Sequence, residues 1–200
     1  MSPRRVLIAL TGASGAIYGW RLLLALRDCP GLERHLVVSA AGVSTLRHEL
    51  QRDVGELAAL VDVVYDVDAI GAAPASGSFR CDAMAIVPCS MRTVAAIAHG
   101  LSDNLITRAA DVMLKERRRL VLVPRETPLH LGHLRRLSML AELGAVICPP
   151  MPAFYLHPQT IDDVVDATVA RVLDLLGIEY AAAARWTGLH TAASSARPVA

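Results

Sequence analysis

Short apolar runs that alternate with helical patterns constrain the fold of this chain more than any other feature. Nearly every position in these runs is apolar, and turn residues bound each run. Strands buried on both faces have this composition, and helices between them supply the crossovers of a parallel sheet. The runs lie at residues 4–10, 35–40, 83–88, 120–124 and 145–149. The pattern predicts an α/β fold with a doubly wound, Rossmann-like, mostly parallel sheet.

Helical patterns fill the sequence between and after these runs. The last begins at Thr160 as N-cap, has acidic residues in its first turn and stops at Gly177. No strand signal follows, so we expect a single domain over residues 1–178 and a loose tail over residues 179–200. Residues 66–80 lack periodicity and are rich in small side chains, which is typical of a functional loop. The predicted helices span residues 16–28, 43–52, 91–99, 103–117, 131–143 and 161–176.

Charge, hydropathy and cysteine content narrow the function. The formal net charge is +1 and no basic stretch is interleaved with aromatic residues, which argues against nucleic-acid binding. No apolar run approaches a membrane span and no signal peptide fits the start, so we expect a cytoplasmic protein with small-molecule ligands. The histidines are dispersed, so no metal site is expected. The four cysteines lack CxxC spacing and are interpreted as reduced, mostly buried thiols: Cys29, Cys81, Cys89 and Cys148.

The first apolar run ends in "TGASGAIYG", residues 11–19, a Gly-rich turn that opens a helix. Such a turn is suited to a phosphate. Ala16 and Tyr18 stand where nicotinamide fingerprints have glycines, and Ser39 stands where an acid would bind the ribose, which argues against a dinucleotide. The N–H groups of residues 12–15 and the hydroxyl of Ser14 suit a single phosphate or a polar ring edge. A tight turn without a ligand remains the alternative.

A second turn of this kind is "PCSMRT", residues 88–93, where the third apolar run meets a helix. Ser90 is a natural N-cap, and Arg92 and Thr93 add donors around the same positive helix end. The carboxyl ends of parallel strands lie along one edge of a sheet, so we expect this turn, Ser39 and the first turn to line one crevice.

Basic residues form a third group amid apolar sequence. Arg108 and Lys115 are seven positions apart, which places them on one face of a helix where a phosphate needs such a pair. Arg125 and Glu126 follow a fully apolar run, so an acid lies beside a base at the ligand edge and is suited to proton transfer. Solvated ion pairs are the alternative for both pairs.

With these elements in place, the chain resembles the UbiX-like flavin prenyltransferases from about Arg5 to Trp186. Four long segments match the family in order and spacing: "TGASGAIYG", "APASGSF", "PCSMRTVAAIAHGLSDNLITRAADVMLKERRRLVLVPRETP" and "PPMPAFYLHPQTIDDVVDATVARVLDLLG". The chain is also similar to the flavin-dependent decarboxylases of cysteine-derived thiols. It lacks their catalytic His after the first turn and has "PASGSF" where they have "PASANT". Such a decarboxylase, or an FMN carrier, is the alternative function.

The resemblance implies a specific reaction. A dimethylallyl group passes from dimethylallyl monophosphate to N5 and C6 of reduced FMN, phosphate is released, and the prenylated FMN serves a UbiD-like decarboxylase. An allylic phosphate leaves as an anion while a carbocation develops, so bound cations suffice without a metal. The resemblance also implies a homo-oligomer, a dodecamer, with sites shared between subunits.

The resemblance further assigns roles to residues of this chain. Ser14, Glu126 and Trp186 are the implied catalytic residues, with Glu126 shuttling a proton. Arg171 lies mid-helix among apolar neighbours, which favours a bound anion over a snorkelling side chain. Ile70 stands where some members have a second Trp. The implied FMN ligands are Gly12, Ala13, Ser14, Ser39, Ser90, Met91, Arg92, Thr93 and Arg125. The implied prenyl-phosphate ligands are Arg108, Lys115, Tyr155, which has a core aromatic as alternative, and Arg171.

Overall fold

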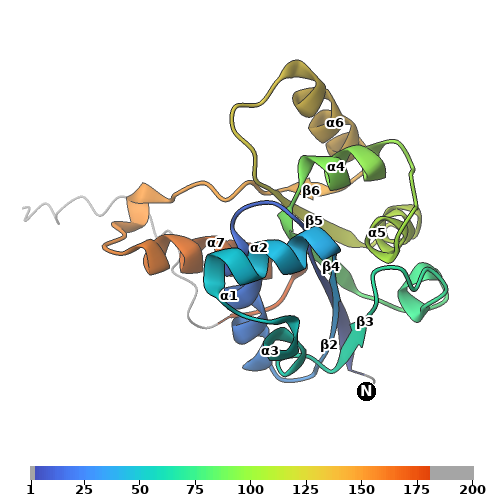
Figure 1. The fold of residues 1–200 in the computed structure, drawn as a ribbon, viewed down its shortest axis with the longest axis horizontal. Coiled ribbons are helices and arrows are strands. Elements are labelled where there is room, and N and C mark those ends of the chain that lie inside the picture. The colour runs from blue at the N-terminus through green and yellow to red at the C-terminus, as the bar shows by residue number, and fades with distance from the viewer. Residues whose placement is uncertain (1–2, 181–200) are drawn as a thin grey trace, which may run out of the picture.

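The structure is a computed structural model and describes residues 3–180. These residues form a six-stranded sheet in the order β3-β2-β1-β4-β5-β6, and every strand pair is parallel (Figure 1). The predicted doubly wound α/β fold is confirmed. The strands are β1 (Arg4–Leu10), β2 (Leu32–Val38), β3 (Val63–Tyr65), β4 (Ala83–Cys89), β5 (Arg119–Pro124) and β6 (Val146–Ile147).

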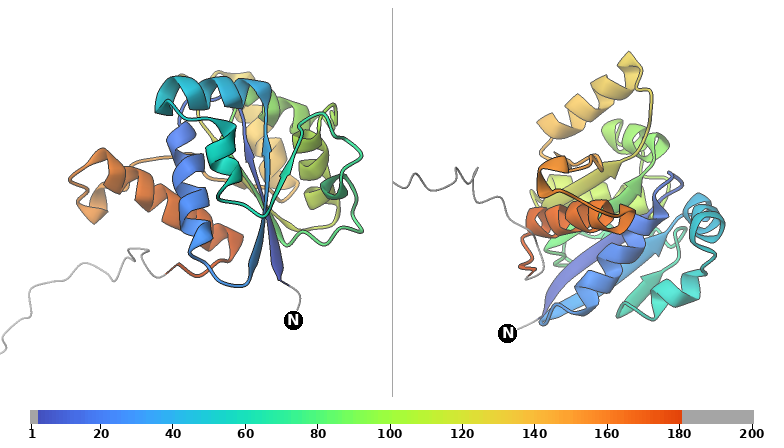
Figure 2. Two further views of the ribbon diagram at one scale, coloured as in Figure 1. Left: turned by 60° about the horizontal axis from the view of Figure 1, so that its bottom comes forward. Right: turned by 90° about the vertical axis from the view of Figure 1, so that its left-hand side faces the viewer.

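Helices cover both faces of this sheet (Figure 2). One face buries Ile8, Val87 and Val123 against α1, α2 and α7, and the other buries Leu7, Met84 and Leu122 beneath α4, α5 and α6. Burial on both faces accounts for the continuous apolar runs. Among residues 3–180, no helix has the length and apolar content needed to cross a membrane. The helices are α1 (Ala16–Arg27), α2 (Ala40–Leu50), α3 (Val54–Ala58), α4 (Met91–Ala98), α5 (Leu105–Lys115), α6 (Leu131–Glu142) and α7 (Ile161–Leu176), with single turns η1 (Ala73–Ala75) and η2 (Phe154–Leu156).

Two short elements escape the sequence pattern. The strand β3 has three residues at the sheet edge, and α3 has five residues and begins with a capping box at Asp53. Neither is long enough to display a period. The strand β2 begins three residues before the predicted start and includes the polar residues 33–35. Because β3 pairs only with the later part of β2, the first residues of β2 lie near the sheet edge, where polar side chains are tolerated. The helix α2 begins directly after its N-cap Ser39, earlier than predicted.

His35 of β2 fastens the loop of residues 66–80 to the sheet. Its side chain is buried, and its ring stacks on Tyr65 and meets Phe79 edge-on at centroid distances of 5.7 and 5.4 Å. Nδ1 lies 3.0 Å from the Tyr65 hydroxyl. Nε2 lies 3.2 Å from a Glu33 carboxylate oxygen but without hydrogen-bond geometry. Burial lowers the pKa of His35, although Glu33 opposes the shift, so the folded protein holds the ring neutral.

This burial predicts acid sensitivity that depends on one residue. The unfolded chain takes up a proton on His35 near the ordinary pKa of 6.5, whereas the folded chain resists it. The stability that the neutral ring contributes is therefore complete above that pH. It is lost as the pH falls further, by up to about 1.4 kcal/mol per pH unit. In His35→Gln, which keeps a hydrogen-bonding group but does not titrate, this part of the pH dependence should vanish.

Urea unfolding at one protein concentration and at pH 7.5, 6.5 and 5.5 measures the effect. The exposed His157 supplies the matched control, because His157→Gln removes a histidine without removing a buried one. Parallel pH dependence of wild type and His35→Gln would contradict the prediction.

Candidate active site

The candidate site lies where the strand order reverses, between β1 and β4, which is the point at which doubly wound sheets bind their ligands. Thr11 ties the two strand ends together. Its hydroxyl donates to the Pro88 carbonyl at 2.8 Å and accepts from the Ser90 N–H at 2.8 Å. The turns after β1 and β4, which the sequence predicts to line one crevice, are thus held side by side.

Two serines predicted at this edge cap helices. The Ser39 hydroxyl accepts from the Gly42 N–H at 3.0 Å at the start of α2, and the Ser90 hydroxyl accepts from the Thr93 N–H at 3.3 Å at the start of α4. Both helix starts therefore present N–H groups at the carboxyl edge of the sheet. Of the other predicted residues here, Met91 and Thr93 are buried, and Arg92 is exposed and paired with Asp103.

The turn after β1 is tightly constrained. A side chain on Gly12 would meet the Ala41 Cβ at 2.4 Å, and Gly15 has a φ of 106°, so both positions favour glycine. The Ala13 N–H donates to the Thr11 carbonyl at 2.9 Å. Ser14 is exposed at this edge of the sheet, as a ligand-binding hydroxyl must be.

Glu49 occupies the positive end of α1. This residue at the end of α2 accepts from the Gly15 and Ala16 N–H groups at 2.9 and 2.8 Å and from the Ser14 hydroxyl. Burial raises the pKa of Glu49, but these hydrogen bonds and the charge of Arg125 outweigh it, and the net pKa lies below its ordinary value. An ionised carboxylate therefore occupies the N–H groups at the start of α1, where the sequence analysis predicts a phosphate. The turn favours the other predicted ligand, a polar ring edge.

Sequence reasoning missed Glu49 because its partners lie 33 and 34 residues away along the chain. It follows "RH" at the end of an ordinary surface helix and belongs to no motif. Only the packing of α2 beside α1 brings its carboxylate to the turn.

Arg125 and Glu126 begin the loop that follows β5. Both side chains are exposed at the carboxyl edge of the sheet, as predicted. The Arg125 N–H donates to the Cys89 carbonyl at 3.3 Å, which holds the start of the loop beside the end of β4. A Glu126 carboxylate oxygen accepts from the Thr127 N–H at 3.0 Å. The Glu126 carboxylate is therefore accessible at the carboxyl edge of the sheet, next in sequence to the exposed Arg125.

Arg108 and Lys115 share a face of α5 that lies against the loop of residues 66–80. Arg108 donates to the Ala75 carbonyl at 3.1 Å and pairs with Asp111, and Lys115 pairs with Glu116. The ion pairs that the sequence left as an alternative are thus present. The same loop also accepts two hydrogen bonds from Arg118, through the carbonyls of residues 77 and 79.

Tyr155 lies in η2 and Arg171 in α7, the helix that follows it. Tyr155 is 57% exposed, so it is no core aromatic. Arg171 is exposed too, which corrects the prediction that apolar neighbours surround it; those neighbours face the sheet while Arg171 faces outward. Burial raises the pKa of the Cys148 thiol, which follows β6, and the nearby positive charge of Arg171 opposes that shift. Trp186 lies outside the described residues.

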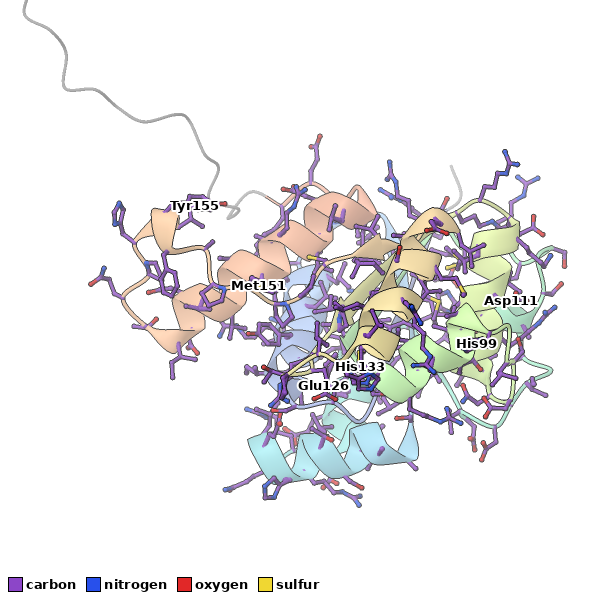
Figure 3. The ribbon with its side chains drawn as sticks, turned by 90° about the horizontal axis from the view of Figure 1, so that it is seen from above. His99, Asp111, Glu126, His133, Met151 and Tyr155 are labelled. Carbon is purple, nitrogen blue, oxygen red and sulfur yellow. The ribbon has the colours of Figure 1, made fainter. Side chains whose placement is uncertain are left out.

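The predicted prenyl-phosphate residues lie on two parts of the chain, Arg108 and Lys115 on α5 and Tyr155 and Arg171 on η2 and α7. In Figure 3, Asp111, the partner of Arg108, and Tyr155 lie on opposite sides of the molecule, and Glu126 lies between them. One chain does not bring Arg108 and Lys115 together with Tyr155 and Arg171.

The cysteines are free thiols, buried or half-buried as predicted. Burial raises the pKa of Cys81 to about 11, and it raises the pKa of Cys89 further, so neither thiol is an activated nucleophile. Residues 3–180 contain no group of three or more His, Cys, Asp or Glu side chains placed to hold a metal ion.

Comparison with known proteins identifies the family of this chain. The Flavoprotein family matches residues 1–173. The flavin prenyltransferase UbiX of Escherichia coli K12 is 53% identical over 187 residues, covering 92% of this chain and 99% of the relative.

Two solved structures superpose closely on this chain. The crystal structure of AnUbiX (PadA1) in complex with FMN and dimethylallyl pyrophosphate has a TM-score of 0.90 at 48% identity, covering 93% of this chain and 98% of that one. A dodecameric FMN-dependent UbiX-like decarboxylase from Escherichia coli O157:H7 also has a TM-score of 0.90 at 48% identity, covering 92% and 100%. The chain therefore belongs to the Flavoprotein family and, within it, to the UbiX-like flavin prenyltransferases.

Proposed function

We propose that this chain joins a dimethylallyl group from dimethylallyl monophosphate to N5 and C6 of reduced FMN, without a metal, and so makes prenylated FMN. The observation that carries the proposal is the juxtaposition at one sheet edge of an accessible acid, Glu126, with Arg125 and the Ser14–Glu49 pair. An FMN carrier needs donors for the flavin but no acid/base residue at this edge.

The donor set at the switch point fits FMN. The starts of α2 and α4 present N–H groups, and the exposed Arg125 supplies a positive charge, which together suit the single phosphate of FMN. The turn of residues 12–14 is left for the polar edge of the ring system, because Glu49 holds the end of α1. We assign the flavin to Gly12, Ala13, Ser14, Ser39, Ser90, Met91, Arg92, Thr93 and Arg125.

Bound FMN supplies, in its reduced form, the nucleophilic N5 and C6 atoms that the dimethylallyl group joins. Glu126 accepts and returns a proton during this transfer and hydrogen-bonds the leaving phosphate when protonated. The Ser14 hydroxyl hydrogen-bonds the ionised Glu49 carboxylate, which would hold and orient it toward the edge of a bound flavin. Trp186 is proposed to line the prenyl group and stabilise developing positive charge.

Four residues are proposed to bind the prenyl phosphate: Arg108, Lys115, Tyr155 and Arg171. Because one chain holds Arg108 and Lys115 apart from the other two, we propose that a neighbouring subunit completes the site. Large apolar side chains exposed on α6 and around η2 favour association into a homo-oligomer, and the dodecamer of the UbiX-like relative is the proposed assembly. They are Leu131, Leu134, Met151, Phe154 and Ile161.

Other predictions remain as the sequence framed them. Delivery of prenylated FMN to a UbiD-like decarboxylase, a cytoplasmic location, and the division into residues 1–178 and a tail of residues 179–200 stay predictions. Thiol decarboxylation is the alternative activity. Turnover of the FMN-saturated protein with a cysteine-derived thiol but not with dimethylallyl monophosphate would favour it.

The proposed role of Glu126 predicts that its substitution slows prenyl transfer and leaves FMN binding intact. Glu126→Gln keeps the shape and hydrogen bonding of the loop but cannot carry a proton. FMN affinity, measured by quenching of flavin fluorescence, should stay within about twofold. Prenyl transfer, followed by the absorbance and mass of the product, should fall by about 10² to 10⁴. A variant within about twofold of wild type would make Glu126 a structural residue.

Arg171 is predicted to act on the prenyl phosphate alone. Arg171→Ala should lower kcat/KM at least about tenfold and leave FMN affinity unchanged, because a hydrogen-bonded ion partner of the leaving group is lost. Arg171→Lys should restore only part of this, since an ammonium lacks the guanidinium fork. Normal kinetics together with a lower melting temperature would instead give Arg171 a purely structural role.

Subunit mixing tests the shared site directly. Arg108→Ala and Arg171→Ala should each be nearly inactive alone. If the two arginines reach one site from different chains, co-assembly at equal amounts gives about a quarter of sites with both arginines intact, and activity returns. If one chain supplied both, every mixed site would lack an arginine. Mixed assemblies would then be no more active than the separate variants.

A further inference from the structure

The loop that carries Arg125 and Glu126 is fixed at both of its ends. It has only five residues, Arg125–Leu129, between the end of β5 and His130, and all five are exposed. The Arg125 N–H holds the first end to β4. The second end is set by the point at which α6 begins.

A histidine side chain sets that point. His130 is the N-cap of α6, and its Nδ1 accepts from the Gly132 N–H at 3.0 Å and the His133 N–H at 3.3 Å. The hydroxyl, carboxylate and amide groups that usually cap helices do not titrate near neutral pH, whereas imidazole does. A side chain on Gly132 would meet the ring at 2.9 Å, so the backbone lies directly against the cap.

This cap works only while the imidazole is neutral. An Nδ1 that accepts hydrogen bonds carries no proton, so the neutral ring bears its proton on Nε2. Protonation adds a hydrogen to Nδ1 itself, which then faces two N–H donors and no acceptor. The two hydrogen bonds at the start of α6 are lost together.

The side chains that contact the start of α6 are titratable or cationic. The His133 ring lies on His130 at a centroid distance of 3.6 Å. Arg136 donates to the Gly132 carbonyl and lies 3.4 Å from His99 at the end of α4, the helix that packs against α6. Glu126, four residues back in the loop, is the acidic residue nearest to His130 in the sequence. A cation on His130 therefore lies among further cationic or titratable groups and the positive end of a helix.

We propose that His130 is a positioning residue that, as a neutral cap of α6, fixes the Arg125–Leu129 loop and thereby the placement of Glu126, and that its protonation releases the loop. The proposal rests on the proposed role of Glu126 for its effect on catalysis. The effect on the loop itself does not depend on any activity.

His130→Asn and His130→Ala separate the cap from its titration. Asn caps helices at any pH, whereas Ala leaves the two N–H groups without a partner. Rates of prenyl transfer at saturating reduced FMN are compared between pH 7.5 and 5.5. The ratio of the Asn variant's rate to that of wild type should rise about fivefold as the pH falls, because only wild type loses its cap. The Ala variant should be slower than wild type at pH 7.5. Its disadvantage should shrink towards pH 5.5.

Asp53→Ala is the matched control. It removes the N-cap of α3, at the opposite end of the molecule in Figure 1. It should lower the melting temperature without changing the pH dependence of the rate. A cap with a merely structural role at α6 would behave in the same way.

Hydrogen exchange of the 130–137 segment, corrected for intrinsic rates, gives a readout that needs no turnover. Wild type should lose protection there at pH 5.5, and the Asn variant should keep it. Identical pH dependence of protection in the two proteins overturns the proposal even if activity is normal. If no variant transfers a prenyl group, the proposed function fails, while the exchange data still decide whether His130 is a titrating cap. A constant rate ratio between pH 7.5 and 5.5 overturns the link to Glu126.

Discussion

The bridge that Thr11 makes between β1 and β4 is the contact on which the site depends. One hydroxyl donates to Pro88 and accepts from Ser90, and so locks the ends of the two central strands at the point where the chain diverges to opposite sides of the sheet. The turns after both strands take their positions from it, and the Arg125 N–H attaches the loop after β5 to the same strand end. Three segments far apart in sequence thereby share one edge.

Local periodicity predicts the strands and helices that are long enough to bury a face, and the burial of both sheet faces explains why. The edge strand β3 and the five-residue helix α3 carry too few residues to show a period. The hydroxyl, Gly-rich and basic groups of the site are visible in sequence because each directly follows a recognisable strand. What the sequence does not reveal depends on helix packing.

Glu49 and Arg171 show both sides of this limit. Glu49 reaches the α1 turn only because α2 packs beside α1, so no local pattern announces it. Arg171 has apolar neighbours in the sequence. However, a helix that packs on one side keeps a solvent-facing side, and Arg171 lies on that side. Neighbours in sequence are therefore a poor guide to burial on an amphipathic helix, even when they are all apolar.

The loop of residues 66–80 binds Arg108 and Arg118 through its backbone carbonyl groups. Carbonyl oxygens of Ala75, Gly77 and Phe79 accept the hydrogen bonds of Arg108 and Arg118. His35 and Tyr65 secure the loop from beneath through Phe79 and stacking. Every residue type has a backbone carbonyl group, so most side chains of this loop take no part in positioning the arginines. The exposed Ile70 is such a position, so a change in its size or chemistry leaves the carbonyl hydrogen bonds to the guanidinium groups in place.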